Sequence, residues 1–431
     1  MKKLLTQLYP LNRLLVGDDN DKALELIKKE LLGMEIFKVP SGTECWTWKV
    51  PEKWTVKEAY VSDGKRKIVD FADHPLHLLS YSLPVDKWVN KKELLSHLYY
   101  AESHLADGGY RTPERPNAIP WRLKYYERDW GFCLPKNQLD ALEGDSFYVK
   151  IDTEFTPGFL SIGDYTIPGK VDEMIVIISN ICHPAQVNDS ISGAVVAVDM
   201  AKQLGTKNNY YTYKFLFLPE TIGSIAYLSH HEHIIPKMIY GIFSEMLGHK
   251  NTFILQYTRQ GNSRIDRIAE YVLKKKTETY RTGKFREVIC NDEGIFNGPG
   301  VNVPTISLTR YPFPEYHTSD DTPDIIYDDM LEEARDLMLD ILQIIDTDFC
   351  PRRKFKGVVF LSRYGLWVDW RKSAEHKKLG ENIEKIMMLL EGDRTVFDIA
   401  QELDMDFDIV LDFILKLEKN NLVERSKINV R

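Results

Sequence analysis

The chain has 431 residues, of which 43% are hydrophobic, 28% charged and 11% aromatic. This length exceeds that of one ordinary domain and predicts two or three. The formal net charge is −8, and such an acidic balance argues against a surface that binds nucleic acid or anionic membranes along the whole chain.

The N-terminal residues 1–21 begin like a signal peptide, but Pro10, Asn12 and Arg13 interrupt the apolar run before it is complete. No stretch reaches 18 consecutive apolar residues, so we expect no membrane span. The five cysteines are widely spaced and include no CxxC pair, which indicates neither a disulfide framework nor a thiolate metal site. These features together predict a cytoplasmic protein.

The first predicted element is a helix over residues 19–33, which has an acidic start and ends at a glycine. From about residue 40 to 155 the sequence is rich in Trp, Tyr and Pro, with short alternating runs and frequent turn signals. This texture predicts a β-rich domain inserted at residues 46–155. The alternative is that residues 46–155 form long loops attached to a larger domain.

Residues 156–346 alternate between buried strands and amphipathic helices, which predicts an α/β fold with a mostly parallel mixed sheet flanked by helices. We assign residues 1–45 and 156–350 to this core. Its predicted strands are 174–182, 213–220, 238–247, 253–258 and 303–310, and its predicted helices are 192–205, 223–231, 263–276 and 327–346.

Residues 351–431 show three amphipathic helices followed by a short β segment, the pattern of a winged helix-turn-helix domain; any three-helix bundle is the alternative. The presumed recognition helix has only two lysines, Lys416 and Lys419, against the acidic residues Asp406, Asp408, Asp412 and Glu418. A DNA-binding face needs basic residues. We therefore expect no nucleic-acid partner, and expect this domain to contact protein, for example in a homo-oligomer.

Polar side chains stand where the predicted strands end. His183 and Asp189 follow the first core strand, Glu220 and Glu245 end the next two, and His317 lies in the loop after strand 303–310. Ligands gather at the carboxyl ends of parallel strands, and mixed histidine and carboxylate ligands suit catalytic zinc. Taken singly, a loop histidine is commonly just solvated and Asp189 is typical of a helix N-cap.

This ordered series resembles the catalytic core of zinc aminopeptidases that use two co-catalytic metals. The matching motifs are SNICHPAQ, NDSISG, ETIG, FSEMLG and EYHTSDD. The resemblance implies that His183, Glu245 and His317 bind metal, that Asp189 bridges the two ions and that Glu220 is the general base. The whole chain is similar to a bacterial aminopeptidase-like family that combines this core with an inserted domain of unknown function and a C-terminal winged helix.

The sequence departs from the family pattern at two positions. The aspartate that usually orients the metal-binding histidine is Ala185 here, and such supporting groups often change affinity or activity 10–100-fold. The second glutamate of the usual pair is Thr221. Glu220 is then either the base, with one metal lacking a carboxylate, or a metal ligand, with the base missing. One or two zinc ions are both compatible with the sequence.

The reaction that these residues predict is zinc-assisted hydrolysis of an amide, with a peptide or another amide as substrate. Tyr311 and Tyr316 lie close to His317 in sequence and are candidates to donate to the tetrahedral oxyanion, although packing is an equally good explanation for them. Asp292 and Glu293 could contact a free α-amino group. The alternatives are a deacylase of an N-acyl sugar or cell-envelope amide, and a catalytically degenerate binding or regulatory protein.

Overall fold

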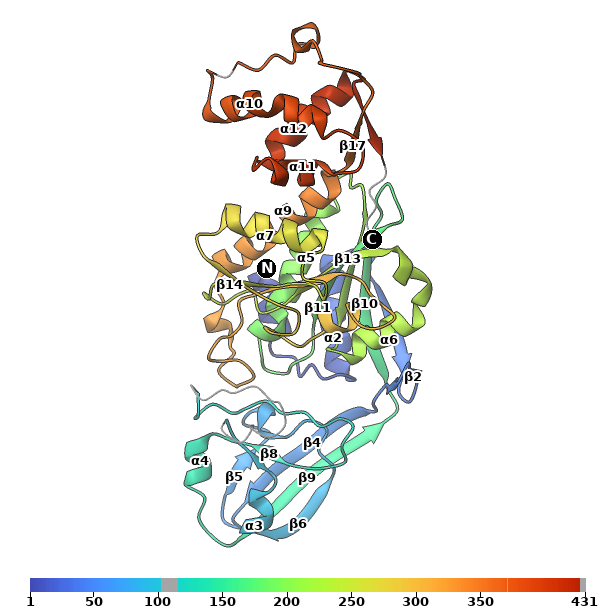
Figure 1. The fold of residues 1–431 in the computed structure, drawn as a ribbon. Helices are drawn as coiled ribbons and strands as arrows, with labels where there is room; N and C mark the ends of the chain where they lie inside the picture. The colour runs from blue at the N-terminus through green and yellow to red at the C-terminus, as the bar shows by residue number, and fades with distance from the viewer. Residues whose placement is uncertain (102–114, 370, 427–431) are drawn as a thin grey trace. The chain divides into compact units, whose positions relative to one another are not determined.

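The computed structural model describes residues 1–101, 115–369 and 371–426 (Figure 1). The chain forms two compact units, Met1–Leu339 and Asp340–Arg431. Among the described residues no helix is long and apolar enough to cross a membrane.

The first unit contains an eight-stranded sheet in the order β1-β10-β12-β11-β13-β16-β14-β15. β11 pairs in parallel with β12 and β13, and the pairs β13–β16 and β14–β15 are also parallel; β1–β10, β10–β12 and β14–β16 are antiparallel. The predicted mostly parallel mixed sheet is confirmed. The strands are β1 Glu35–Pro40, β10 Phe159–Ile167, β11 Met174–Asn180, β12 Thr212–Leu218, β13 Met238–Ser244, β14 Phe253–Gln256, β15 Tyr280–Gly283 and β16 Thr305–Thr309.

Helices cover this sheet (Figure 1), and for that reason every residue of β11 is buried. The helices of this unit are α1 Lys2–Leu8, α2 Asp18–Glu30, α5 Gly193–Leu204, α6 Ile222–His230, α7 Arg264–Lys276 and α8 Glu293–Phe296; α9 Asp328–Thr347 begins in this unit and ends in the second. Gly193 lets the start of α5 approach the end of β13, because a Cβ at this position would lie 1.9 Å from the carbonyl oxygen of Ser244. This close approach brings the loop before α5 to the carboxyl edge of the sheet.

The same unit contains an antiparallel four-stranded sheet in the order β5-β4-β9-β6. Its buried side chains alternate along the strands, as the period of two requires: Ala59 pairs with Ile151, and Val61 with Val149. The strands are β4 Lys53–Ser62, β5 Lys67–Asp70, β6 Val85–Asn90 and β9 Ser146–Thr156; the smaller elements are β2 Glu44–Cys45, β3 Trp48–Lys49, α3 Lys91–Leu95, β7 Leu98–Tyr99, β8 Phe132–Cys133 and α4 Lys136–Asp140. The assignment of residues 46–155 to a separate domain stays a prediction.

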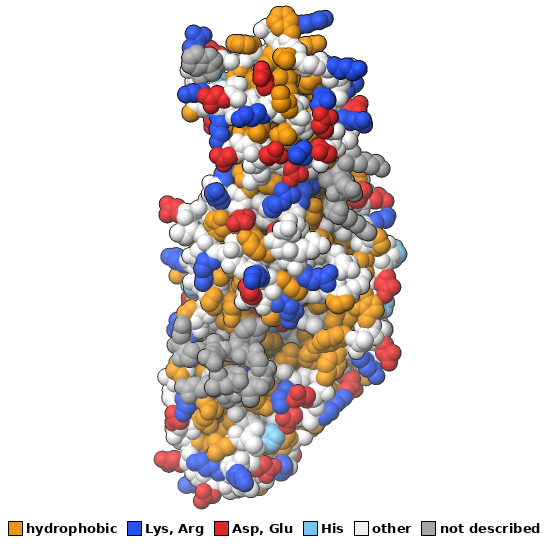
Figure 2. Space-filling view, viewed as in Figure 1, with side chains coloured by type: hydrophobic (Ala, Val, Ile, Leu, Met, Phe, Trp, Pro, Cys, Tyr) orange, Lys and Arg blue, Asp and Glu red, His pale blue; other side chains and the backbone are white. Residues whose placement is uncertain are grey.

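The second unit contains α10 Ala374–Met388, α11 Val396–Glu402 and α12 Phe407–Lys419, with β17 Cys350–Arg353 and β18 Val423–Ser426 paired antiparallel. Thr395 and Asp398 form a capping box at the start of α11. Acidic and basic side chains are interspersed on the face of this unit that Figure 2 shows. Helices followed by a strand agree with the expected order of elements, and the winged helix-turn-helix assignment stays a prediction.

Candidate metal centre

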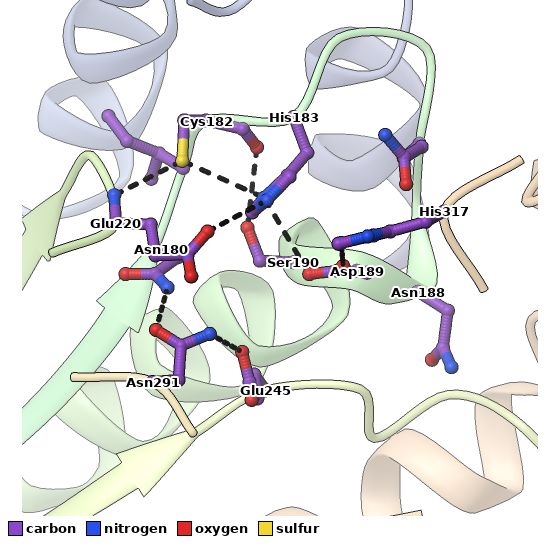
Figure 3. Close-up of polar contacts among 12 residues, drawn as sticks. Asn180, Cys182, His183, Asn188, Asp189, Ser190, Glu220, Glu245, Asn291 and His317 are labelled. Atoms are coloured by element: carbon purple, nitrogen blue, oxygen red, sulfur yellow. Dashed lines mark hydrogen bonds and ion pairs between the residues drawn. The ribbon is translucent and has the colours of Figure 1, made fainter. Parts of the chain in front are cut away.

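The carboxyl ends of three neighbouring parallel strands carry the predicted side chains. His183 follows β11, Glu220 follows β12 and Glu245 follows β13, and β11 lies between the other two strands. Parallel strands end at the same edge, so these residues meet there. Figure 3 shows them together with Asp189 and His317.

His183, Asp189 and His317 form the tightest group. Asp189 Oδ1 lies 3.6 Å from His183 Nδ1, and Asp189 Oδ2 lies 2.9 Å from His317 Nε2. One donor atom from each of the three side chains lies within 4.8 Å of the others. His183 and Asp189 are 1% and 2% exposed, whereas the His317 side chain is 16% exposed, so solvent reaches this group only from the His317 side.

The loop that carries Asp189 is held by a carboxylate that the sequence analysis missed. Asp321 accepts hydrogen bonds from the backbone N–H groups of Asn188 (2.8 Å) and Asp189 (3.0 Å). Burial, the larger cause, raises the pKa of Asp321 to about 7, against the lowering effect of these hydrogen bonds. The TSDD sequence after His317 was the only available signal for this role.

Glu220 lies on the other side of His183, with Oε2 3.0 Å from His183 Nε2. Its side chain is 29% exposed, which leaves room for water or substrate to reach it. The next residue, Thr221, has a φ of +61°, and its N–H lies 3.2 Å from both carboxylate oxygens of Asp292. Asp292 thus fixes the turn that directs Glu220 toward His183.

Glu245 is fully buried and lies outside the group of His183, Asp189 and His317. Its Oε2 accepts a hydrogen bond from Asn291 Nδ2 (3.1 Å), and Asn291 accepts one from Asn180. Its Oε1 is buried and has no hydrogen-bond partner in the part of the chain that the structure describes. Burial first, and then the charges of Asp189 and Glu220, raise the pKa of Glu245 well above its usual range.

Further carboxylates crowd the site. Burial raises the pKa of Asp292 to about 7 and that of Glu293 to about 8. The Glu293 carboxylate accepts hydrogen bonds from Gln256 and from the N–H of Asn291. Protein donors therefore already engage both acids, and their contact with a substrate amino group stays a prediction.

The two histidines respond to this acidic surrounding in opposite directions. Burial alone would lower the pKa of His183, but the charge of Asp189 and contacts with Cys182 and Glu220 raise it well above its ordinary value. Burial outweighs Asp189 at His317 and lowers its pKa. The site thus combines several carboxylates, two imidazoles and a Glu245 oxygen that has no hydrogen-bond partner among the described residues. This set of groups suits a divalent cation, because buried carboxylates are costly unless a positive charge compensates them.

Arg13 is a second residue that the sequence analysis missed as part of the site. It is 1% exposed, and it donates to the carbonyl oxygens of Ile181 (2.8 Å), His183 (2.6 Å) and Gln186 (2.9 Å). This guanidinium thereby ties the segment after α1 to the loop after β11. A separation of about 170 residues between the partners gave no sequence signal.

A segment between β7 and β8 covers the histidines. The Trp121 ring lies 4.4 Å from the His183 ring and 4.8 Å from the His317 ring, measured between centroids. The backbone N–H of Trp121 donates to the backbone carbonyl oxygen of His317 (2.8 Å). Beside them is a cavity of about 140 Å³, with Leu14, Leu123, Tyr125 and Glu220 among its lining residues.

The two predicted tyrosines lie next to His317. The Tyr316 ring stacks on the His317 ring at 3.9 Å, and the Tyr311 and Tyr316 rings lie 5.0 Å apart. Burial, followed by the charge of Asp189, raises the pKa of Tyr311 to about 12. The Tyr311 phenol is therefore protonated near neutral pH, as a hydrogen-bond donor must be.

The family model described as a domain of unknown function (DUF4910) matches residues 2–348. The chain belongs to this family. It is also 34% identical, over 348 residues, to a Clostridium acetobutylicum protein that is named as a polysaccharide biosynthesis protein with an aminopeptidase-like domain; the match covers 80% of this chain and 77% of that protein. The predicted kinship with an aminopeptidase-like family is confirmed.

Solved structures agree with this placement. A Clostridium acetobutylicum protein described as a peptidase has a TM-score of 0.84 at 30% identity, covering 99% of this chain and 96% of that one. A zinc aminopeptidase from Bacillus subtilis has a TM-score of 0.58 at 14% identity, covering 80% and 94%. An aminopeptidase from Aneurinibacillus sp. strain AM-1 has a TM-score of 0.54 at 15% identity, covering 80% and 92%. The fold is that of the aminopeptidases.

Proposed function

We propose that this DUF4910 family member is a zinc-dependent hydrolase that cleaves an amide bond, with the activity of an aminopeptidase-like peptidase. The observation that carries the proposal is the buried group of His183, Asp189 and His317, with Glu220 and Glu245 at the same sheet edge. The zinc in the name of the Bacillus subtilis relative supports the choice of metal.

The residues that would hold zinc are His183, Asp189 and His317, with Glu245 as a further carboxylate. Bound there, zinc supplies Lewis-acid activation of the scissile carbonyl and of a water molecule. One or two ions are compatible with this donor set. The contact of Glu220 with His183 places its carboxylate beside the metal-binding residues.

In this mechanism Glu220 accepts the proton of the attacking water and returns it to the leaving amine, so that the proton count balances. Tyr311 and Tyr316 donate hydrogen bonds to the oxyanion that forms at the former carbonyl oxygen. The Trp121 ring packs against both histidines and reduces their contact with water, which strengthens these interactions.

A deacylase of an N-acyl sugar is the second candidate. Polysaccharide biosynthesis in the name of the 34% identical relative favours it, and the chemistry at the site is the same. For either substrate, we propose that the enzyme acts in the cytoplasm, does not bind nucleic acid and self-associates through its C-terminal unit. A peptide or another amide is the substrate partner.

The test is metal analysis of the purified protein, followed by activity assays on aminoacyl-arylamides and on N-acyl sugars. We expect one or two zinc ions per chain, and hydrolysis in one substrate class that a chelator abolishes and zinc restores. His317→Ala should lose both zinc and activity, whereas His376→Ala, at an exposed position, should retain both. A protein that binds no zinc, or hydrolyses neither class, would contradict the proposal and favour a binding or regulatory role.

A further inference from the structure

Cys182 lies inside the candidate site, directly before His183. It is 3% exposed and is among the residues that line the cavity with Glu220 and Thr221. Its Sγ lies 3.6 Å from His183 Nδ1 and accepts a hydrogen bond from the N–H of Glu220 at 3.1 Å. Figure 3 shows the sulfur between these two neighbours. Donor atoms of Cys182, His183 and Glu220 form a second group within 4.8 Å.

The position of this sulfur matters because the residue that follows Glu220 brings no negative charge to the site. Thr221 stands where the aminopeptidase pattern has its second glutamate, and a threonine hydroxyl does not bring a negative charge. The residue before Thr221 is Glu220, and its backbone N–H donates a hydrogen bond to Cys182 Sγ. A deprotonated thiol here supplies the same charge as the missing carboxylate, and thiolates rank among the preferred ligands of zinc.

The separation of the donor atoms also fits. Zinc lies ~2.3 Å from sulfur and ~2.0 Å from a histidine nitrogen, so two such ligands at a tetrahedral angle are roughly 3.5 Å apart. The measured distance between Cys182 Sγ and His183 Nδ1 is 3.6 Å. The Glu220 N–H that points at the sulfur further stabilises a negative charge on it.

We infer that Cys182 is a thiolate ligand of the ion that His183 binds. The inference rests on the metal binding in the proposed function, and it adds a ligand that the aminopeptidase pattern does not contain. Zinc binding at this position releases the thiol proton to solvent and forms a sulfur–zinc bond, with no change of oxidation state. Glu220 then remains available as the base.

X-ray absorption at the zinc edge of the zinc-loaded, full-length wild type tests the inference without a variant. We expect one sulfur scatterer at ~2.3 Å beside the nitrogen and oxygen ligands. The cobalt-loaded protein should likewise show a near-ultraviolet sulfur-to-cobalt charge-transfer band. Bound zinc with nitrogen and oxygen ligands alone would overturn the role of Cys182 and leave the proposed hydrolase intact. Failure to bind any zinc would overturn both.

Matched variants assign the sulfur. Cys182→Ser should lose the sulfur signal and bind zinc about tenfold more weakly or worse, while Cys290→Ser, which removes an exposed thiol, should keep both. Cys182→Asp restores an anionic ligand, so it should recover zinc affinity without the sulfur signal. A sulfur signal that persists in Cys182→Ser would overturn the inference.

Discussion

Glu220 differs from the other carboxylates of the site in its exposure. Asp189 and Glu245 are closed off from water, whereas the Glu220 side chain is 29% exposed and borders the cavity. A general base must reach both a water molecule and a leaving group, and a purely structural carboxylate need not. The contact with His183 Nε2 also allows Glu220 to act as a ligand, so the two roles need separate measurements.

Replacing Glu220 by Gln keeps the size of the side chain and removes its ability to accept a proton. If Glu220 is the base, we expect turnover to fall by roughly 10²–10⁴-fold with little change in zinc content. Turnover and zinc stoichiometry should be measured on the same preparation, with Glu278→Gln as a control at an exposed position. Loss of zinc together with activity would assign Glu220 as a ligand, and wild-type values of both would make it structural.

The sequence predicted that three residues of the candidate site follow neighbouring strands, and the structure places them there. A continuous apolar run predicts the buried strand that comes before each of them, and this is how His183, Glu220 and Glu245 could be found. Arg13 and Asp321 escaped notice, because their roles consist of hydrogen bonds to backbone atoms far away in the sequence. A backbone carbonyl that accepts from Arg13, or a backbone N–H that donates to Asp321, leaves no trace in the identity of its residue, so apart from the TSDD sequence no motif pointed to these contacts.

At the scale of elements, the loop after β11 depends on the N-terminal segment. The Arg13 guanidinium donates to Ile181, His183 and Gln186, and also to the carbonyl oxygen of Leu8 at the end of α1. The φ of His183 is +78°, a conformation that an isolated loop rarely adopts. Arg13 therefore holds the backbone that aims His183 at Asp189.

Arg13→Lys keeps the charge but cannot donate to several carbonyl groups in one plane. We expect a zinc affinity about 10–100-fold lower and a free energy of unfolding lower by at least about 2 kcal/mol, since buried carbonyl oxygens lose their donors. Zinc titration and urea unfolding measure the two effects. Arg128→Lys, at an exposed arginine, is the control, and wild-type zinc affinity in Arg13→Lys would refute the positioning role.

Prediction of the elements succeeded where strands were uniformly apolar and failed where polar residues interrupt them. β10 was missed because Gly163, Asp164 and Thr166 break its pattern. In the fold, Asp164 is satisfied by Lys214 Nζ and by the hydroxyl group of Tyr227, each at 2.6 Å. These partners come from β12 and α6, so only the tertiary structure makes the polar residue compatible with the sheet.

The acidic surface of α12 leads to a prediction about DNA. Asp408 and Asp412 are exposed on this helix, and Lys416 is paired with Asp412. Since DNA binding requires basic groups that neutralise phosphates, the full-length protein should show no measurable duplex binding at physiological salt. Fluorescence anisotropy with a labelled duplex tests this. Tight binding that weakens as salt increases would contradict it.

At the scale of the whole molecule, the buried acids of the site make the stability of the metal-free protein depend on pH. Burial raises the pKa of Glu293 from its ordinary value of 4.5 to about 8, and that of Asp292 from 3.8 to about 7. The folded state thus binds protons that the unfolded state has already released between these values. Each group stabilises the fold fully below its unfolded pKa, and this contribution is lost as pH rises through the folded pKa.

The free energy of unfolding of the metal-free protein should therefore fall from pH 5 to pH 8, by up to about 1.4 kcal/mol per pH unit for each such group. Glu293→Gln cannot ionise and keeps an oxygen that can accept from the N–H of Asn291. The free energy of unfolding of this variant should fall less steeply with pH, because one ionising group is gone. The difference in free energy of unfolding, variant minus wild type, should therefore be larger at pH 8 than at pH 5. Urea unfolding at several pH values measures both slopes, with Glu278→Gln expected to match the wild type. Equal slopes in Glu293→Gln and wild type would show that Glu293 ionises near its ordinary pKa, and that the acidic interior is relieved by means other than protonation.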